Sequence, residues 1–219
     1  MSIDPQYWQW LNAEWNAGRL TRPGTALQNL KAQPRQFLTH FPIQNNFDPN
    51  ASGQAQVFIF NGVAGQRPGS VLGTSNMHAT ETFTIQPRAG QLGEGNPFWV
   101  HGLHTGQSSA GPVWYTLDGS GPDIMLTAKL TGCTFVARPG PAAGSVEVTH
   151  LMPHQETGLA LNQRMNIPGQ QAYGRLKYDF NVRSVNVVGV RVGGRWKIYV
   201  QKLEKQNMAI RSVHRIYPT

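Results

Sequence analysis

Beyond residue 54 the chain consists largely of short apolar runs in which every second residue is hydrophobic, separated by clusters of Gly, Pro, Asn and Ser. Four of these runs are QAQVFIF, ETFTIQP, PFWVHGL and PVWYTLD, which begin at residues 54, 81, 97 and 112. A period of two is typical of strands, because successive side chains point to opposite faces of a sheet. The 24 Gly and 15 Pro residues supply turns. The sequence therefore predicts an α+β fold: a β-rich sandwich of mixed sheets with peripheral helices.

The clearest hairpin is predicted late in the chain, in NVVGVRVGGRWKIYVQKLE at residues 186–204. Gly193 and Gly194 lie at its centre, where a two-residue turn needs positive φ angles. The alternation that follows assigns one set of side chains to water, namely Arg195, Lys197, Tyr199 and Gln201. It assigns the other set to the protein interior, namely Trp196, Ile198 and Val200.

The N-terminal region is predicted to be helical. Asp4 and Pro5 suit the first positions of a helix. The helix has one aromatic face, formed at positions i, i+3 and i+7 by Trp8, Leu11 and Trp15. A second short helical stretch is expected at residues 25–31. We expect residues 1–50 to form a helical segment that packs on, or targets, a β-rich catalytic domain at residues 51–219.

Composition limits the compartment in which the chain is expected to fold. No run approaches the ~20 apolar residues of a membrane span. The N-terminus lacks the basic and apolar regions of a secretory signal. A single cysteine permits no internal disulfide. We therefore expect a chain suited to a reducing cytosol, or to export by a route that leaves no signal in the sequence.

The net charge of +8 is concentrated in the C-terminal part of the chain. Residues 164–219 contain eleven Lys and Arg against Asp179 and Glu204, a balance of +9, whereas residues 1–163 have a balance of −1. A positive field raises the rate of encounter with anions. An acidic protein partner, nucleic acid and a simple solvated basic face all agree with this pattern.

Cys133 is the only cysteine, and His150 follows it after a turn-rich stretch and the alternating run SVEVTH. The apolar residues 124–130 that precede it are consistent with a buried strand or the start of a buried helix. Gly132 leaves room for a substrate carbonyl to reach main-chain N–H groups. Two segments joined by a turn would bring Cys133 and His150 side by side. The residues alone leave two interpretations open: a nucleophile with its base, or a small buried hydrophobic residue.

These residues resemble the motifs of the Cys–His glutamine deamidases, which include the cytotoxic necrotizing factor catalytic domains, the Burkholderia lethal factor toxin and the bacterial chemoreceptor deamidases. Leu-Thr-Gly-Cys at residues 130–133 is similar to the Leu-Ser-Gly-Cys motif of the two toxin groups. Thr127 stands where the lethal factor and the chemoreceptor enzymes have a Thr that helps orient the histidine. His-Leu-Met-Pro at residues 150–153 looks like a motif ending of the chemoreceptor enzymes. A weaker similarity to the lethal factor follows at residues 185–201.

The resemblance implies a protein-glutamine deamidase that acts as a bacterial effector or toxin. Cys133 would attack the side-chain amide carbon of a glutamine, with His150 as acid and base and Thr127 holding the imidazole in the correct tautomer. The motif around the nucleophile, including the backbone that would meet the oxyanion, is Leu130, Thr131 and Gly132 together with Cys133 itself. An adjacent imidazole is expected to lower the Cys133 pKa from its free value of ~8.5.

No cofactor and no metal are implied. The expected partner is a protein substrate that carries the target glutamine and has an acidic surface. The expected location is the bacterial cytoplasm before export, then the cytosol of a target cell. A cysteine peptidase or a transglutaminase with the same Cys–His pair stays open as an alternative. So does a basic β-rich module that binds nucleic acid or protein through Arg191, Arg195, Trp196, Lys197, Tyr199 and Lys202.

Two other polar groups in the sequence are weaker candidates. His101 and His104 are separated by three positions, and in a strand such residues point to opposite faces, which argues against a metal site. Asp118 and Asp123 flank the turn sequence GSGP, and turn chemistry is expected to explain both. No phosphate-binding loop or dinucleotide glycine pattern is present.

Overall fold

The structure is a computed structural model of the chain of 219 residues. It describes residues 30–40, 43–45, 56–61, 83–86, 98–103, 105–178, 182–204 and 210–218. The predicted aromatic helix that begins at Asp4, and most of the predicted helical stretch at 25–31, lie outside the described residues. Within the described ranges, no helix has the length and apolar character needed to cross a membrane.

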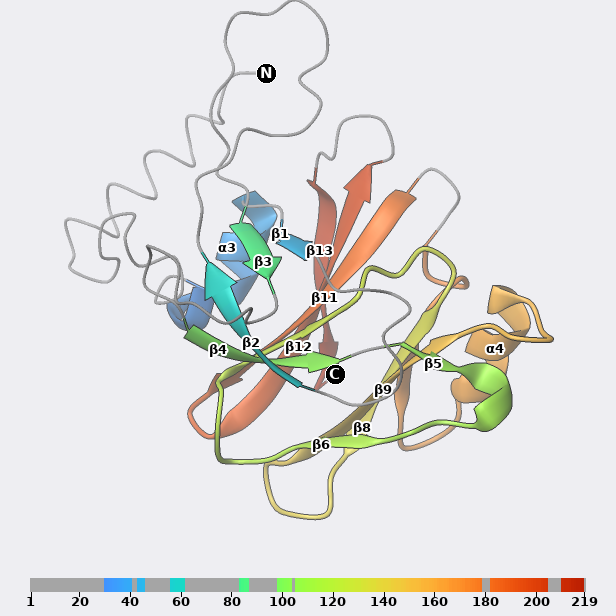
Figure 1. Cartoon of the computed structure of the whole chain (residues 1–219), viewed down its shortest axis with the longest axis horizontal. Helices are drawn as coiled ribbons and strands as arrows, with labels where there is room; N and C mark the ends of the chain where they lie inside the picture. Colours follow the sequence, from blue (N-terminus) through green and yellow to red (C-terminus); the bar gives the residue numbers. More distant parts are fainter. Residues whose placement is uncertain are drawn as a thin grey trace, which may run out of the picture.

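Two mixed β-sheets dominate the molecule (Figure 1). The eight-stranded sheet has the order β1-β3-β2-β4-β7-β11-β12-β13, and in the five-stranded sheet β10-β8-β9-β5 run side by side while β6 pairs with β9. The strands of the first sheet are β1 Ile43–Asn45, β2 Gln56–Asn61, β3 Phe83–Gln86, β4 Phe98–Leu103, β7 Ile124–Thr127, β11 Val182–Val192, β12 Arg195–Glu204 and β13 Ile210–Tyr217. Those of the second are β5 Gly106–Gln107, β6 Tyr115–Leu117, β8 Thr134–Pro139, β9 Val146–Met152 and β10 Gln171–Tyr173. The apolar run after Pro122 is therefore a strand, β7, and not a helix.

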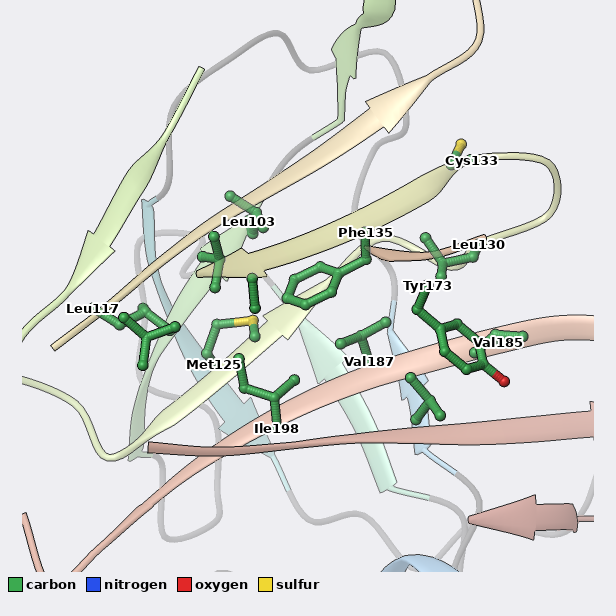
Figure 2. Packing of buried hydrophobic residues seen from close by; sticks show 14 of the residues in the cluster. Leu103, Leu117, Met125, Leu130, Cys133, Phe135, Tyr173, Val185, Val187 and Ile198 are labelled. Atoms are coloured by element: carbon green, nitrogen blue, oxygen red, sulfur yellow. The ribbon is translucent and has the colours of Figure 1, made fainter. Parts of the chain in front are cut away.

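The two sheets pack face to face, and the largest apolar cluster lies between them. Phe135 and Val148 of the five-stranded sheet belong to the same cluster as Met125, Val187 and Ile198 of the eight-stranded sheet. Figure 2 shows these layers meeting, with Phe135 above Met125 and Val187. Burying both inner faces removes a large apolar area from water, and this burial is the main force that holds a sandwich together.

Each outer face is covered by a helix. Helix α3, Pro34–His40, contributes Phe37 and Leu38 to a cluster on the outer face of the eight-stranded sheet. Helix α4, Gly158–Met165, contributes Leu161 and Met165 to a cluster on the outer face of the five-stranded sheet. The helices lie on opposite sides of the molecule in Figure 1. The predicted α+β class, a β-rich sandwich with peripheral helices, is confirmed for the described residues.

The late hairpin forms as predicted, but the predicted exposure of its side chains is wrong for part of β12. β11 and β12 pair antiparallel around Gly193 and Gly194, whose φ angles are 58° and 74°. Tyr199 and Gln201, however, are buried, so the expectation of a fully wet face on β12 is wrong. The reason is α3: the Gln201 side-chain amide donates to the Leu38 carbonyl oxygen over 2.6 Å. Only the beginning of that face, at Arg195, is exposed.

The described part of the predicted N-terminal segment is joined to the β-rich region. β1 extends the eight-stranded sheet by pairing in parallel with β3. Lys31 forms an ion pair with Asp123, whose carboxylate also accepts hydrogen bonds from the Arg191 side chain. These contacts fix the residues before α3 to the start of β7 and the end of β11.

Candidate active site

The β8–β9 hairpin brings the cysteine and the histidine to one face of the five-stranded sheet. Phe135 pairs with His150, and residues directly opposite each other in antiparallel strands share a face. Cys133 immediately precedes β8 and belongs to the same inner cluster as Phe135. In Figure 2 it lies at the edge of that cluster, with its sulfur pointing away from Phe135. Cys133 and His150 are therefore diagonal neighbours at one end of the sandwich.

Thr127 reaches His150 from the opposite sheet. Its Oγ1 lies 2.6 Å from His150 Nδ1 and 2.7 Å from the Ala128 carbonyl oxygen. A carbonyl oxygen only accepts, so the threonine hydroxyl donates its hydrogen to Ala128. Thr127 Oγ1 must then accept from the ring, which places the hydrogen of the neutral imidazole on Nδ1. The free lone pair of the ring is therefore on Nε2, and this is the nitrogen that can accept a proton.

His150 Nε2 is buried, and it has no hydrogen-bond partner within the described part of the chain. The whole side chain is 1% exposed. An unbonded polar atom in a native interior calls for an explanation, of which a catalytic role is one; among the described residues His101 Nε2 is another such atom. The arrangement therefore holds a base in a fixed orientation, with its basic nitrogen unused.

Thr105 is a part of the site that sequence reasoning missed. Its Oγ1 lies 3.3 Å from the same His150 Nδ1. It immediately precedes β5, and β5 pairs in parallel with β9 at Leu151 and Met152. β5 is two residues long and has no hydrophobic alternation, so no pattern in the sequence could indicate that it lies beside His150.

Both members of the Cys–His pair are neutral in this state. Burial raises the pKa of Cys133 to about 11, against a smaller lowering by the backbone of Thr131 and Gly132. Burial also lowers the pKa of His150 to about 3. The expectation that His150 lowers the thiol pKa is wrong for this state, because desolvation disfavours both charged forms, and what lowers the Cys133 pKa is the backbone of Thr131 and Gly132.

The backbone that leads into Cys133 is held on two sides. Leu130 is buried and exchanges backbone hydrogen bonds of 2.9 and 3.0 Å with Val185. The Tyr178 hydroxyl donates to the Cys133 carbonyl oxygen over 3.1 Å. Between them Thr131 is exposed, and a Cβ built on Gly132 would meet nothing within 4 Å among the described residues. One side of this turn is thus open next to the sulfur.

Helix α4 packs its first turn against the same segment. Thr157 caps the helix by accepting from the Ala160 N–H over 3.1 Å. A Cβ built on Gly158 would lie 2.5 Å from the Gly132 carbonyl oxygen and 3.0 Å from the Arg175 side chain. Only glycine allows this close approach, so Gly158 is a further site-supporting residue that the motif did not indicate.

The other candidates have structural roles. His101 Nδ1 lies 2.9 Å from the Tyr115 hydroxyl and forms a second polar link between the two sheets; His104 lies outside the described residues. Asp118 accepts from the Ser120 N–H and hydroxyl, as turn chemistry predicts. Asp123 differs from that prediction, since Lys31 and Arg191 are its partners. Among the described residues, no group of three or more His, Cys, Asp or Glu side chains is arranged to hold a metal ion.

No family model matches the chain, and no curated protein matches its sequence.

Proposed function

We propose that the protein is a protein-glutamine deamidase in which Cys133 is the nucleophile, His150 the acid and base, and Thr127 the residue that fixes the histidine tautomer. The observation that carries this proposal is the 2.6 Å contact between Thr127 and His150, because it leaves Nε2 as an unused buried base on the face that also holds Cys133. The similarity of residues 127–153 to the Cys–His deamidases supports the same assignment.

The chemistry begins from a neutral pair. As Cys133 Sγ attacks the side-chain amide carbon of a glutamine, its proton passes to His150 Nε2, and the carbonyl becomes an oxyanion. We assign the stabilisation of that oxyanion to the backbone N–H groups of the 131–133 turn. His150 returns the proton to the leaving nitrogen and ammonia departs, which leaves a thioester on Cys133. Water then attacks the thioester with His150 as base, glutamate is released and the thiol is restored.

The depth of the thiol favours a glutamine side chain over a peptide bond as the substrate group. Cys133 is only 8% exposed, and the open side of the turn is at Gly132. A glutamine presents its amide at the end of two methylene groups, with no chain beyond it. A peptide carbonyl has a residue on each side, and both would have to enter with it. This difference supports deamidation more than peptide cleavage.

Expression of the wild type and of Cys133→Ala in eukaryotic and in bacterial cells tests the proposal. The expected result is toxicity confined to the wild type, together with a Gln-to-Glu change in at least one host protein by mass spectrometry. Equal toxicity from both proteins, without such a change, contradicts it. Delivery from a bacterial cytoplasm to a target-cell cytosol is part of the same proposal. The test of this part is which of the two cell types, eukaryotic or bacterial, is sensitive to the wild type.

A basic binding module is the second candidate, favoured by the exposed side chains of Arg195, Arg211 and Arg215 on β12 and β13. The aromatic part of that alternative is wrong: Trp196 and Tyr199 are buried and offer no platform on which bases stack. Nucleic-acid binding through these arginines would weaken steeply with salt and would be the same in Cys133→Ala. Filter binding of single-stranded DNA and RNA at two salt concentrations checks it.

A further inference from the structure

Three exposed apolar side chains belong to segments that border Cys133. Extending the β8–β9 register by one residue pair places Met152 across from Cys133. Leu159 follows Gly158, which packs on Gly132. Leu176 is in the turn after β10, and its N–H donates to Asn162 of α4 over 3.1 Å. We call these three side chains the apolar rim.

The three side chains of the apolar rim are strongly exposed for hydrophobic residues. Met152, Leu159 and Leu176 are 41, 47 and 48% exposed. Among the described residues the other large hydrophobic side chains with comparable exposure are Val113 and Ile167. Single exposed apolar residues need no explanation, but a group of them around one feature marks an interaction surface. Methionine suits such a surface, because its flexible side chain adapts to the group that it contacts.

Positive charge gathers on the same side of the site. Arg175 and Lys177 flank Leu176, and Lys202 donates from its ammonium group to the Lys177 carbonyl oxygen over 2.7 Å. The guanidinium of Arg175 lies 5.3 Å from the centre of the Tyr178 ring, and the Tyr178 hydroxyl bonds to the Cys133 carbonyl. Arg175 is thus linked through Tyr178 to the segment that holds the cysteine, and Lys177 and Lys202 are neighbours of Arg175 and of each other. A surface of this kind favours a partner that combines apolar and acidic side chains.

We infer that the apolar rim, with Arg175, Lys177 and Lys202 beside it, is the docking surface for the substrate protein, and that it selects a glutamine flanked by apolar and acidic residues. This inference rests on the proposed function, because it names the substrate class of the same site. The docked segment covers the rim, and its glutamine side chain enters beside Gly132. Met152 contacts the methylene groups of the glutamine, since the extended register places it across from Cys133 on the adjoining strand.

The test measures binding separately from chemistry. The probe is a fluorescein-labelled peptide with glutamine between leucine and glutamate, and its binding to Cys133→Ala is followed by fluorescence polarisation. We expect the double change Leu159→Ser and Leu176→Ser in that background to weaken binding about tenfold, the equivalent of ~1.4 kcal/mol. Lys177→Glu should weaken it as well and reduce its dependence on salt. A peptide with serine and lysine in the flanking positions should bind the unsubstituted surface no better than it binds the double variant.

Ile167→Ser is the matched control. Ile167 is 54% exposed and lies beyond the C-terminal end of α4, whereas Gly158 marks the end that faces Cys133. It should bind the probe like its parent. The inference is overturned if no binding is measured, if the two peptides bind equally, or if the rim and control variants behave alike. If the wild type deamidates its target and the rim variants do so equally well, the docking inference is contradicted and the proposed chemistry is not. If binding is tight and depends on the rim but no deamidation occurs, the proposed chemistry is contradicted and the docking inference is not.

Discussion

At the scale of the residue, the central feature is a histidine whose Nδ1 lies against two threonine hydroxyls, one from β7 and one from the residue just before β5. Thr127 accepts from Nδ1 at 2.6 Å, and Thr105 lies 3.3 Å from the same nitrogen. Thr127 stood out in the sequence because of its spacing from Cys133 within a recognisable motif. Thr105 did not, since its place beside His150 depends on a two-residue strand that pairs with a distant one. Short-range patterns report local conformation, and they carry little information on such non-local contacts.

The tautomer can be tested at Thr127. Thr127→Val keeps the shape of the side chain and removes the acceptor, so the buried Nδ1–H loses its main partner, at a cost of about 1–3 kcal/mol. We expect a mixture of tautomers and a fall of about tenfold or more in the rate of the Gln-to-Glu conversion, because each ~1.4 kcal/mol is a factor of ten. Thr127→Ser should recover most of the rate. Nitrogen NMR of the imidazole reads the tautomer directly; an unchanged Nδ1–H tautomer in Thr127→Val would show that Thr127 does not set it.

The neutral thiol predicts an unusual pH profile for alkylation. With a pKa of about 11, only about one Cys133 in ten thousand is a thiolate at pH 7. Iodoacetamide should therefore modify the folded protein more slowly than free cysteine at neutral pH. The rate should keep rising above pH 9, where that of free cysteine has levelled off, and unfolding in urea should restore the ordinary profile. Fast modification near neutrality would mean that the free protein already holds a thiolate–imidazolium pair.

At the scale of the element, the site depends on the 131–133 turn, which contacts the first turn of α4 at Gly158 and the turn after β10 at Tyr178. The β11–β12 hairpin was predictable because Gly193 and Gly194 have a clear local reason to form a turn. The run at 124–130 was ambiguous in the sequence, since a strand buried on both faces has no alternation. The prediction of a solvent-exposed face on β12 was wrong for a related reason. Helix α3 covers Tyr199 and Gln201, and local sequence patterns do not encode such tertiary contacts. The close approach of α4 to Gly132 is likewise absent from any local pattern.

Gly158→Ala tests whether that approach matters. Helix propensity alone predicts a gain of roughly 1 kcal/mol in stability when alanine replaces a helical glycine. The new Cβ, however, would lie 2.5 Å from the Gly132 carbonyl oxygen. We therefore expect the free energy of unfolding to fall by about 1–3 kcal/mol, the usual range for overpacking, with a loss of activity as the turn moves. Thermal and urea unfolding measure the sign.

Gly119→Ala is the control for that change, because a Cβ there would meet nothing within 4 Å among the described residues. Its stability should stay close to that of the wild type. A stabilised Gly158→Ala protein would show that the first turn of α4 does not support Cys133.

At the scale of the whole molecule, the site is part of the interface between the sheets. Thr127 belongs to the eight-stranded sheet and His150 to the five-stranded sheet, so their hydrogen bond also ties the two layers together. The sandwich architecture followed from strand periodicity and turn composition in the sequence. Which strands form each layer, and which faces meet, could not be predicted, because the alternating pattern marks a face as apolar but does not say which other apolar face it packs against. The position of the site between the layers therefore makes global stability respond to the protonation of His150.

This coupling predicts a loss of stability in acid. Burial lowers the folded-state pKa of His150 to about 3, while the unfolded chain keeps an ordinary value of ~6.5. Above pH 6.5 neither state binds the proton. As the pH falls from about 6.5 towards about 3, the unfolded chain is protonated first and stability declines. His150→Asn retains a donor towards Thr127 and removes the titration. Urea unfolding between pH 7 and pH 4 should show a smaller decline for this variant, and equal slopes would contradict the coupling.

The most direct test of the deamidase proposal follows the fate of the amide nitrogen and of water. Purified wild type is incubated with a eukaryotic cell lysate in water labelled with heavy oxygen, and the proteins are mapped by mass spectrometry after digestion. The expected products are uncleaved target proteins in which one glutamine has become glutamate with a heavy oxygen atom, with no such change for Cys133→Ala or His150→Ala. Cleaved chains, or glutamine joined to an amine, would place the same Cys–His pair in a different reaction. If this lysate and a bacterial lysate treated in the same way both stay unmodified, the proposed activity is contradicted.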